Sequence, residues 1–90
     1  MNIFIKFFRT VFPEPTEEQL LAKAEKLLIK LKYLSLEKRE SSKHQKLLDD
    51  IATCEKFMKF AHDTKPGNKM PILKVNISFI KYYRTLYTYF

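Results

Sequence analysis

The sequence predicts a mainly α-helical fold built on an antiparallel helical hairpin. Apolar residues recur every three to four positions in two segments of similar length, and a run of ten polar residues, 37–46, separates the two segments. Turn-forming prolines precede the pair, and a Pro-Gly turn follows it. We interpret residues 1–90 as one small domain with an aromatic arm (1–12), a helical hairpin (16–62) and a basic, aromatic tail (63–90).

The first helix is predicted to begin after Thr16. Thr16 and Gln19 have the spacing of a capping box, in which the hydroxyl accepts a free amide of the first turn and the Gln side chain reaches back. Glu17 and Glu18 add negative charge at the positive end of the helix dipole. The apolar stripe that follows consists of Leu20, Ala24, Leu27, Leu31 and Leu34, widened by Leu21, Leu28 and Ile29.

The second helix repeats this apolar spacing. A single helix running through the polar run would have a polar seam for more than a turn, so we expect a break near Ser41 and Ser42, either of which can cap the second helix. No Gly or Pro enforces the break, and the alternative is one rod of about 70 Å. The second stripe consists of Leu47, Ile51, Cys54, Met58 and Ala61, flanked by Leu48, Phe57 and Phe60.

The arm carries its large apolar residues on one face at helical spacing. It can fold onto the hairpin as a third element, close over a ligand or a neighbouring subunit, or anchor the chain at a membrane surface, which is the least favoured of the three. The arm is too short to span a bilayer and has no signal-peptide cleavage site. The apolar residues are Ile3, Phe4, Phe7, Phe8, Val11 and Phe12.

The tail combines positive charge with aromatic rings. Asp63 is its one acidic residue, against five Lys or Arg residues, and it contains four of the five tyrosines. Such a segment can bind the phosphates and bases of a nucleic acid, or form a surface strand or a poorly ordered end. A possible β-like strand is indicated by Leu73, Val75, Ile77 and Phe79, which alternate with polar residues. After Phe79 the periodicity fits a helix or a strand.

The size and cysteine content of the chain limit its expected oligomeric state and its compartment. Two amphipathic helices in a chain of 90 residues bury little surface, so we expect a third element or a second copy, with a homo-oligomer as the default. A single cysteine, Cys54, excludes an internal disulfide and suits a reducing cytoplasm, where it acts as a small hydrophobe on the helical seam.

The sequence offers no catalytic constellation. His44 and His62 lie eighteen residues apart, without a zinc-protease pattern, a paired-cysteine motif or a Gly-rich phosphate loop. No nucleophile, base and orienting group can be assembled at a predictable spacing. We therefore expect a non-enzyme without a metal or another cofactor, in which both histidines are solvated or capping groups.

Binding is the class of function that remains, and the first helix offers a candidate binding surface. Lys23, Lys26 and Lys30 are spaced three and four apart, so they share a face beside the apolar stripe. One interpretation is a solvated face with salt bridges. The other is a row of lysines that faces phosphates at an oligomer interface, with Phe8 or Phe12 of the arm stacking on a base.

This layout of a short aromatic arm, a proline turn and a helical hairpin with early lysines resembles the small phage proteins that sequester cyclic oligonucleotides in anti-CBASS immunity. The resemblance covers residues 1–62. It implies an oligomer in which aromatic and lysine side chains at protomer boundaries hold a cyclic nucleotide without cleaving it. Those roles would fall on Phe8 or Phe12 and on Lys26, and the β-like tail departs from the family's mostly helical pattern.

The expected function is therefore sequestration of a phosphate-bearing ligand, such as a cyclic oligonucleotide, to antagonise anti-phage signalling in the host cytoplasm. Two alternatives stay open. The hairpin can act as an inhibitor or scaffold that binds another protein through its apolar stripe. The arm and tail can instead form a nucleic-acid or membrane-surface module.

Overall fold

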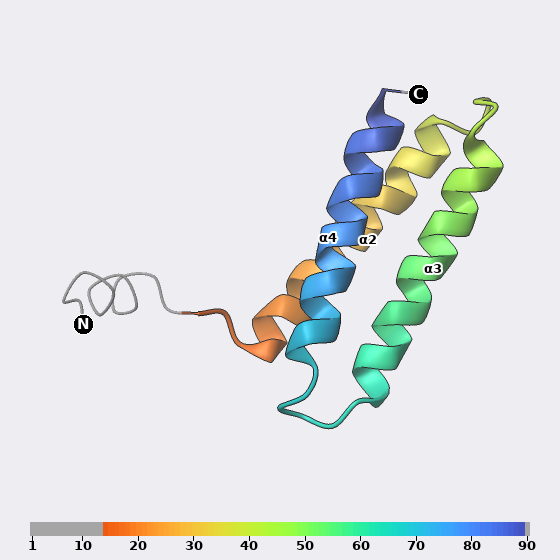
Figure 1. The fold of residues 1–90 in the computed structure, drawn as a ribbon. Helices are drawn as coiled ribbons and strands as arrows, with labels where there is room; N and C mark the ends of the chain where they lie inside the picture. Colours follow the sequence, from red (N-terminus) through yellow and green to blue (C-terminus); the bar gives the residue numbers. More distant parts are fainter. Residues whose placement is uncertain (1–13, 90) are drawn as a thin grey trace.

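A computed structural model of the chain describes residues 14–89, most of which lie in three helices (Figure 1). Helix α2 spans Glu17–Glu37, α3 spans His44–Asp63 and α4 spans Met70–Thr88. Figure 1 shows α3 running antiparallel to both α2 and α4, which run parallel to each other. The prediction of a mainly helical chain is confirmed. The arm, and every interpretation placed on it, lies outside the described residues.

The start of α2 has the predicted capping box. The Gln19 amide donates to Thr16 Oγ1 at 3.1 Å, and the Thr16 amide donates to Gln19 Oε1 at 2.9 Å. Two backbone donors that a helix start leaves unpaired are thereby satisfied. The capping box therefore fixes where α2 begins.

A turn separates α2 from α3 within the polar run, at residues 38–43. The prediction that a serine caps α3 is wrong, because the N-cap is Lys43 and no side chain bonds to the first turn. Ser41 acts one step earlier, since its Oγ accepts the Lys43 amide at 3.1 Å inside the turn. The hydroxyl thus stabilises the turn rather than the helix start.

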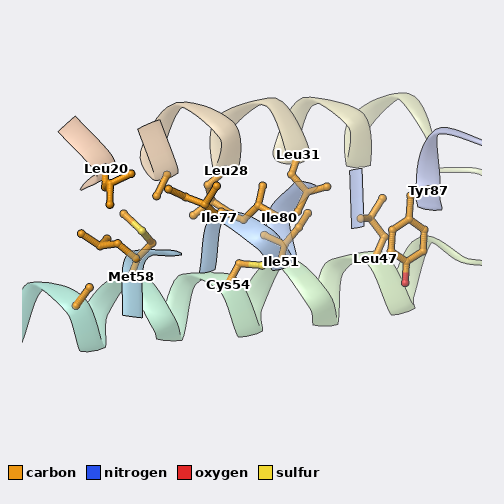
Figure 2. Close-up of a cluster of buried hydrophobic side chains, with 13 residues drawn as sticks. Leu20, Leu28, Leu31, Leu47, Ile51, Cys54, Met58, Ile77, Ile80 and Tyr87 are labelled. Carbon is orange, nitrogen blue, oxygen red and sulfur yellow. The ribbon is translucent and has the colours of Figure 1, made fainter. Parts of the chain in front are cut away.

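The core lies along the axis where the three helices meet (Figure 2). On α3 the buried residues are the five of the predicted stripe. On α2 the buried face is shifted, because Leu28 is buried, Leu27 is only partly buried and Ile29 is 54% exposed. The shift arises because α2 packs against α4 as well as α3, which turns its buried face to a line between them. Buried on α2 are Leu20, Ala24, Leu28, Leu31 and Ser35.

The β-like strand predicted in the tail is wrong, because this segment is the helix α4 and no strand occurs among residues 14–89. A strand would place alternate apolar residues on one face, whereas Leu73 and Ile77 are buried here and Val75 is 46% exposed. Pro71 in the first turn of α4 favours a helix start, since proline fixes the helical φ angle and the first amides need no partner. The tail is the third element of the core.

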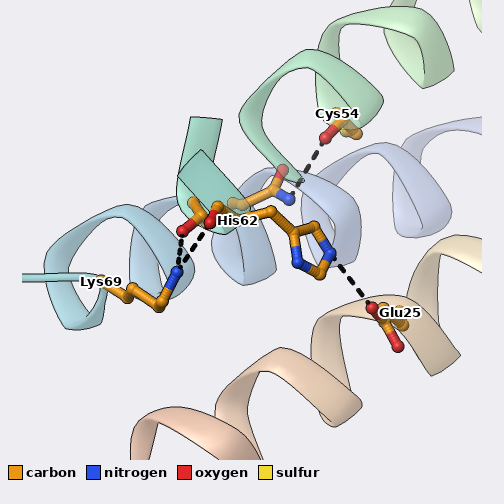
Figure 3. Close-up of polar contacts among 6 residues, drawn as sticks. Glu25, Cys54, His62 and Lys69 are labelled. Carbon is orange, nitrogen blue, oxygen red and sulfur yellow. Dashed lines mark hydrogen bonds and ion pairs between the residues drawn. The ribbon is translucent and has the colours of Figure 1, made fainter. Parts of the chain in front are cut away.

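Asn76 is a polar residue at a core position of α4. Its side chain is fully buried, and Nδ2 donates to the backbone carbonyl of Cys54 at 3.2 Å (Figure 3). This bond ties α4 to α3, whereas the buried Oδ1 atom of Asn76 accepts no hydrogen bond from residues 14–89.

The starts of α2 and α4 are held together at one end of the bundle. The Glu17 carboxylate accepts the amides of Gly67 at 2.7 Å and Lys69 at 2.8 Å. Lys69 Nζ in turn donates to the last carbonyls of α3, those of Ala61 and His62 (Figure 3). Gly67 has a φ of +97°, which only glycine adopts without strain. This network places the first turn of α2 beside the first turn of α4.

Helix α4 supplies the third element that the size of the helical pair requires. A second copy is therefore not required to supply a third element to the pair. Within residues 14–89, no helix is long and apolar enough to cross a membrane.

Candidate functional site

The predicted lysine row lies on the outer surface of α2. Lys23, Lys26 and Lys30 are all exposed, as both interpretations of the row require. Lys30 borders a surface hollow of about 370 Å³ between α2 and α4. Across this hollow lie Arg84 and Thr88 of α4, so the C-terminal helix brings a second cation to the end of the lysine row.

A second hollow of about 410 Å³ continues this surface along α4. Arg84 and Thr88 line both hollows, so the two are adjacent. We call the combined surface the α2/α4 basic groove. Its charged and aromatic residues are Lys30, Tyr33 and Glu37 of α2, and Lys81, Arg84 and Tyr89, which belong to α4 or directly follow it.

Helical spacing places the cations of this groove. Lys81 and Arg84 are three residues apart on α4, so both project to the side that faces α2. Lys23 precedes Lys30 by seven residues, as Lys74 precedes Lys81, and seven residues are close to two helical turns. Because α2 and α4 run parallel (Figure 1), two rows of cations extend side by side from the groove toward the starts of these helices.

The cations of the groove have no acidic partner in the part of the chain that the structure describes. Lys30, Lys81 and Arg84 form no ion pair there through their charged groups. By contrast, Lys32 Nζ lies 3.5 Å from Glu55 Oε1 on the side of α2 that faces α3. Glu37 is the one acidic residue that lines the groove. The groove therefore carries a positive potential toward solvent.

The structure adds Lys81 and Arg84 to the residues that sequence analysis named. The basic character of the tail was the available signal, but the incorrect strand placed these cations away from α2. Lys23 and Lys26 share the face of Lys30 by helical spacing. Phe8 and Phe12, the predicted stacking residues, lie outside the described residues.

The histidines and the cysteine have structural surroundings. His62 Nε2 lies 3.3 Å from Glu25 Oε1, which joins α3 to α2 (Figure 3). His44 is partly exposed at the start of α3. Cys54 is fully buried, and burial raises the pKa of its thiol to about 11, so the nucleophilic thiolate is disfavoured at neutral pH.

One further polar pair joins α3 to α4. The Tyr87 hydroxyl donates to Asp50 Oδ2, and the Tyr87 side chain is almost completely buried. Burial, with this hydrogen bond second, raises the pKa of Tyr87 above its ordinary value of 10.0. A tyrosine that holds its proton this firmly locks two helices together and is unsuited to proton transfer.

No group of three or more His, Cys, Asp or Glu side chains within residues 14–89 is arranged to hold a metal ion. The comparisons with protein families, curated proteins and solved structures return no match to this chain. The arrangement that remains, unpaired cations beside tyrosines in an open groove, is suited to binding an anion with planar groups.

Proposed function

We propose that the chain is a non-catalytic binding protein that sequesters a phosphate-bearing ligand, and that the α2/α4 basic groove holds its phosphates. The observation that carries this proposal is the meeting of Lys30 and Arg84 at one hollow. An Arg guanidinium binds two phosphate oxygens at once, and a Lys ammonium adds a compact positive charge beside it. Lys81 extends the same surface along α4.

The tyrosines of the groove indicate that the ligand also carries a planar base. Tyr33 is 65% exposed and Tyr89 is 84% exposed, so both rings are open to stacking with a planar base. Together with the cations they favour a nucleotide over inorganic phosphate or a sugar phosphate. Lys23 and Lys26 would continue the positive surface beneath a longer ligand.

The resemblance to phage sequestering proteins suggests a cyclic oligonucleotide as this ligand. Holding such a signal without cleaving it would antagonise anti-phage signalling in a host cytoplasm, if the chain is phage-encoded. Binding without turnover agrees with a groove that contains cations and rings and is lined by one carboxylate, that of Glu37.

Calorimetric titration with cyclic dinucleotides and cyclic trinucleotides tests the proposal. We expect Lys30→Glu and Arg84→Glu each to weaken binding about tenfold or more, since a hydrogen bond to a charged group contributes about 1.5–3 kcal/mol. Lys46→Glu is the matched control, because Lys46 is exposed on α3 and its reversal changes the net charge by the same amount. The released ligand should be recovered intact.

Three results would contradict the proposal. Equal weakening by all three variants would indicate general charge attraction, and no weakening by any would place the ligand elsewhere. Equally tight binding of linear oligonucleotides of the same composition would replace sequestration of a cyclic signal with the nucleic-acid module. A lower affinity for linear than for cyclic ligands would support sequestration of a cyclic signal over the nucleic-acid module.

A second candidate function rests on an apolar stripe along α2. Ile29, Tyr33 and Leu36 are 54%, 65% and 63% exposed, and their spacing of four and three puts them on one face. A helix with such a stripe can dock in a groove of another protein, as an inhibitor or scaffold would. Ile29→Glu would abolish capture of such a partner and leave cyclic nucleotide binding unchanged.

A further inference from the structure

The α2 side of the basic groove presents three kinds of side chain in a fixed order along the helix. Lys30, Tyr33 and Glu37 line the same hollow, and their spacing of three and four residues puts them on one face of α2. The cation and the carboxylate are separated by about 10 Å along the helix axis, with the ring between them. A nucleotide follows the same order, with a phosphate at one end, a flat base next and the hydrogen-bonding edge of that base at the other end.

Glu37 supplies this hollow with a carboxylate that forms no ion pair within residues 14–89. Its side chain is exposed, and neither Lys30 nor Arg84 pairs with it, although both line the same hollow. The carboxylate also accepts no hydrogen bond from the described part of the chain. A carboxylate has two acceptor oxygens and no donor. The hollow therefore presents a pair of acceptors beside two cations.

The position of Glu37 is unfavourable for the helix itself. Glu37 is the last residue of α2, where the unpaired backbone carbonyls form the negative end of the helix dipole, and no basic residue lies in the last turn. Negative charge stabilises the start of a helix, as at Glu17 and Glu18, and destabilises its end. Helix stability thus gives no reason for a carboxylate here, whereas recognition of a ligand gives one.

Two acceptor oxygens side by side match the edge of one base in particular. The base-pairing edge of guanine places the N1–H and N2–H donors next to each other, so a carboxylate can accept both bonds at once. Adenine and cytosine each place one donor beside an acceptor, and uracil places one donor between two acceptors. An acceptor opposite a carboxylate oxygen stays unpaired, which weakens binding.

We infer that the basic groove selects guanine and that Glu37 is the residue that recognises this base. The inference rests on the proposed function, because it concerns the same ligand in the same groove. Lys30 and Arg84 hold a phosphate, and Tyr33 stacks on the base. Glu37 then accepts two hydrogen bonds from the edge of that base. The preferred ligand is a cyclic nucleotide that contains guanine.

Calorimetric titration with three cyclic dinucleotides of equal charge, which carry guanine, adenine or uracil, tests the inference. We expect the native chain to bind the guanine ligand about tenfold or more tightly than the other two, since a bidentate pair with a base edge discriminates by roughly this factor. Glu37→Gln keeps the size of the side chain but replaces one acceptor by a donor, so the three affinities should become nearly equal. Because the loss of a negative charge strengthens all three ligands alike, the ratio of the affinities is the quantity compared.

Glu40→Gln is the matched control, because Glu40 is exposed in the turn after α2, lines neither hollow and loses the same charge. This variant should keep the guanine preference of the native chain. Equal affinity of the native chain for the three ligands would overturn the inference and leave the proposed function standing. A preference that survives Glu37→Gln, or that Glu40→Gln also removes, would do the same. If none of the three binds, the inference is wrong, and the proposed function fails with it if cyclic trinucleotides do not bind either.

Discussion

The two sides of α4 differ in chemistry although they belong to one helix. Toward α2 it presents Lys81 and Arg84, which lie in a groove with Lys30. Toward α3 it presents Phe79 and Tyr83, which lie in a chain of ring contacts that begins at Phe57. The charges of Lys81 and Arg84 thus lie on one side of α4, and the exposed rings of α4 gather on the other.

This separation shows that one helix can present two surfaces of different chemistry. The α2 side can attract an anion through charge, which acts at a distance and is screened by salt. The α3 side can bind only through contact and burial of apolar area, which has no long-range component. Changes that break α4, screen charge or loosen one side should therefore have separable effects.

The largest expected effect comes from breaking α4 itself. Ile80 is fully buried where α4 meets the other two helices (Figure 2), so Ile80→Asp would bury an unpaired charge. The cost should be about 4 kcal/mol or more, which is most of the stability of a domain this small. The whole helix should unfold, so the surfaces toward α2 and α3 should be lost together. The helical signal in circular dichroism measures this loss.

Ser78→Asp is the matched control for this substitution. Ser78 is exposed on the same helix, and the introduced carboxylate would be solvated. Its unfolding midpoint in urea should stay close to that of the native chain. Retention of a cooperative, native-like transition by Ile80→Asp would contradict the packing of α4 in the core.

The second prediction uses salt to separate the effect of charge on the α2 side of α4 from that of apolar packing on its α3 side. A ligand with three phosphate contacts should bind roughly twentyfold more weakly when monovalent salt rises from about 50 to about 200 mM, since each contact releases counterions. The unfolding midpoint in urea should hold or rise slightly over the same range, because the core that holds α4 against α3 is apolar. Calorimetric titration and urea unfolding across the same salt series measure the two effects. A parallel decline in both would show that charge controls both sides.

Sequence analysis could place α2 and α3 because their local signals agree. The capping box of Thr16 and Gln19 and the stripe from Leu47 to Ala61 are set by short-range spacing, and the structure contains both. The segment from Leu73 to Phe79 has β-branched residues in alternation, and only packing against two other helices overrides that pattern. Element type there depends on tertiary contacts that spacing does not contain.

Only the α2 side of the basic groove could be predicted from the sequence. Lys23, Lys26 and Lys30 share a helix, so their common face follows from the sequence. Arg84 is 54 positions beyond Lys30, and their proximity depends on the parallel alignment of α2 with α4. With the tail interpreted as a strand, no spacing rule could bring the two cations together.

The third prediction loosens the α3 side near the end of α4. Tyr87→Phe removes the hydrogen bond to Asp50 and should lower the free energy of unfolding by about 1 kcal/mol. Because the pKa of Tyr87 is raised in the folded chain by burial and by this bond, its contribution is constant below pH 10 and declines above it. Urea unfolding at pH 7 measures the change, and an unaltered midpoint would show that the bond adds nothing.

The last prediction concerns the start of the α2 side, where the effect should be smallest. The backbone hydrogen bond from Gly67, with that from Lys69, lowers the pKa of Glu17 below its ordinary value of 4.5 in the folded chain. The carboxylate therefore adds stability above pH 4.5, and this stability is lost as the pH falls through the lower, folded pKa. In Glu17→Gln the uncharged amide should lower the melting temperature at pH 7 by less than Tyr87→Phe does. Its melting temperature should also fall less steeply than that of the native chain as the pH drops below 4.5. Identical acid profiles for both chains would mean that this carboxylate does not hold the starts of α2 and α4 together.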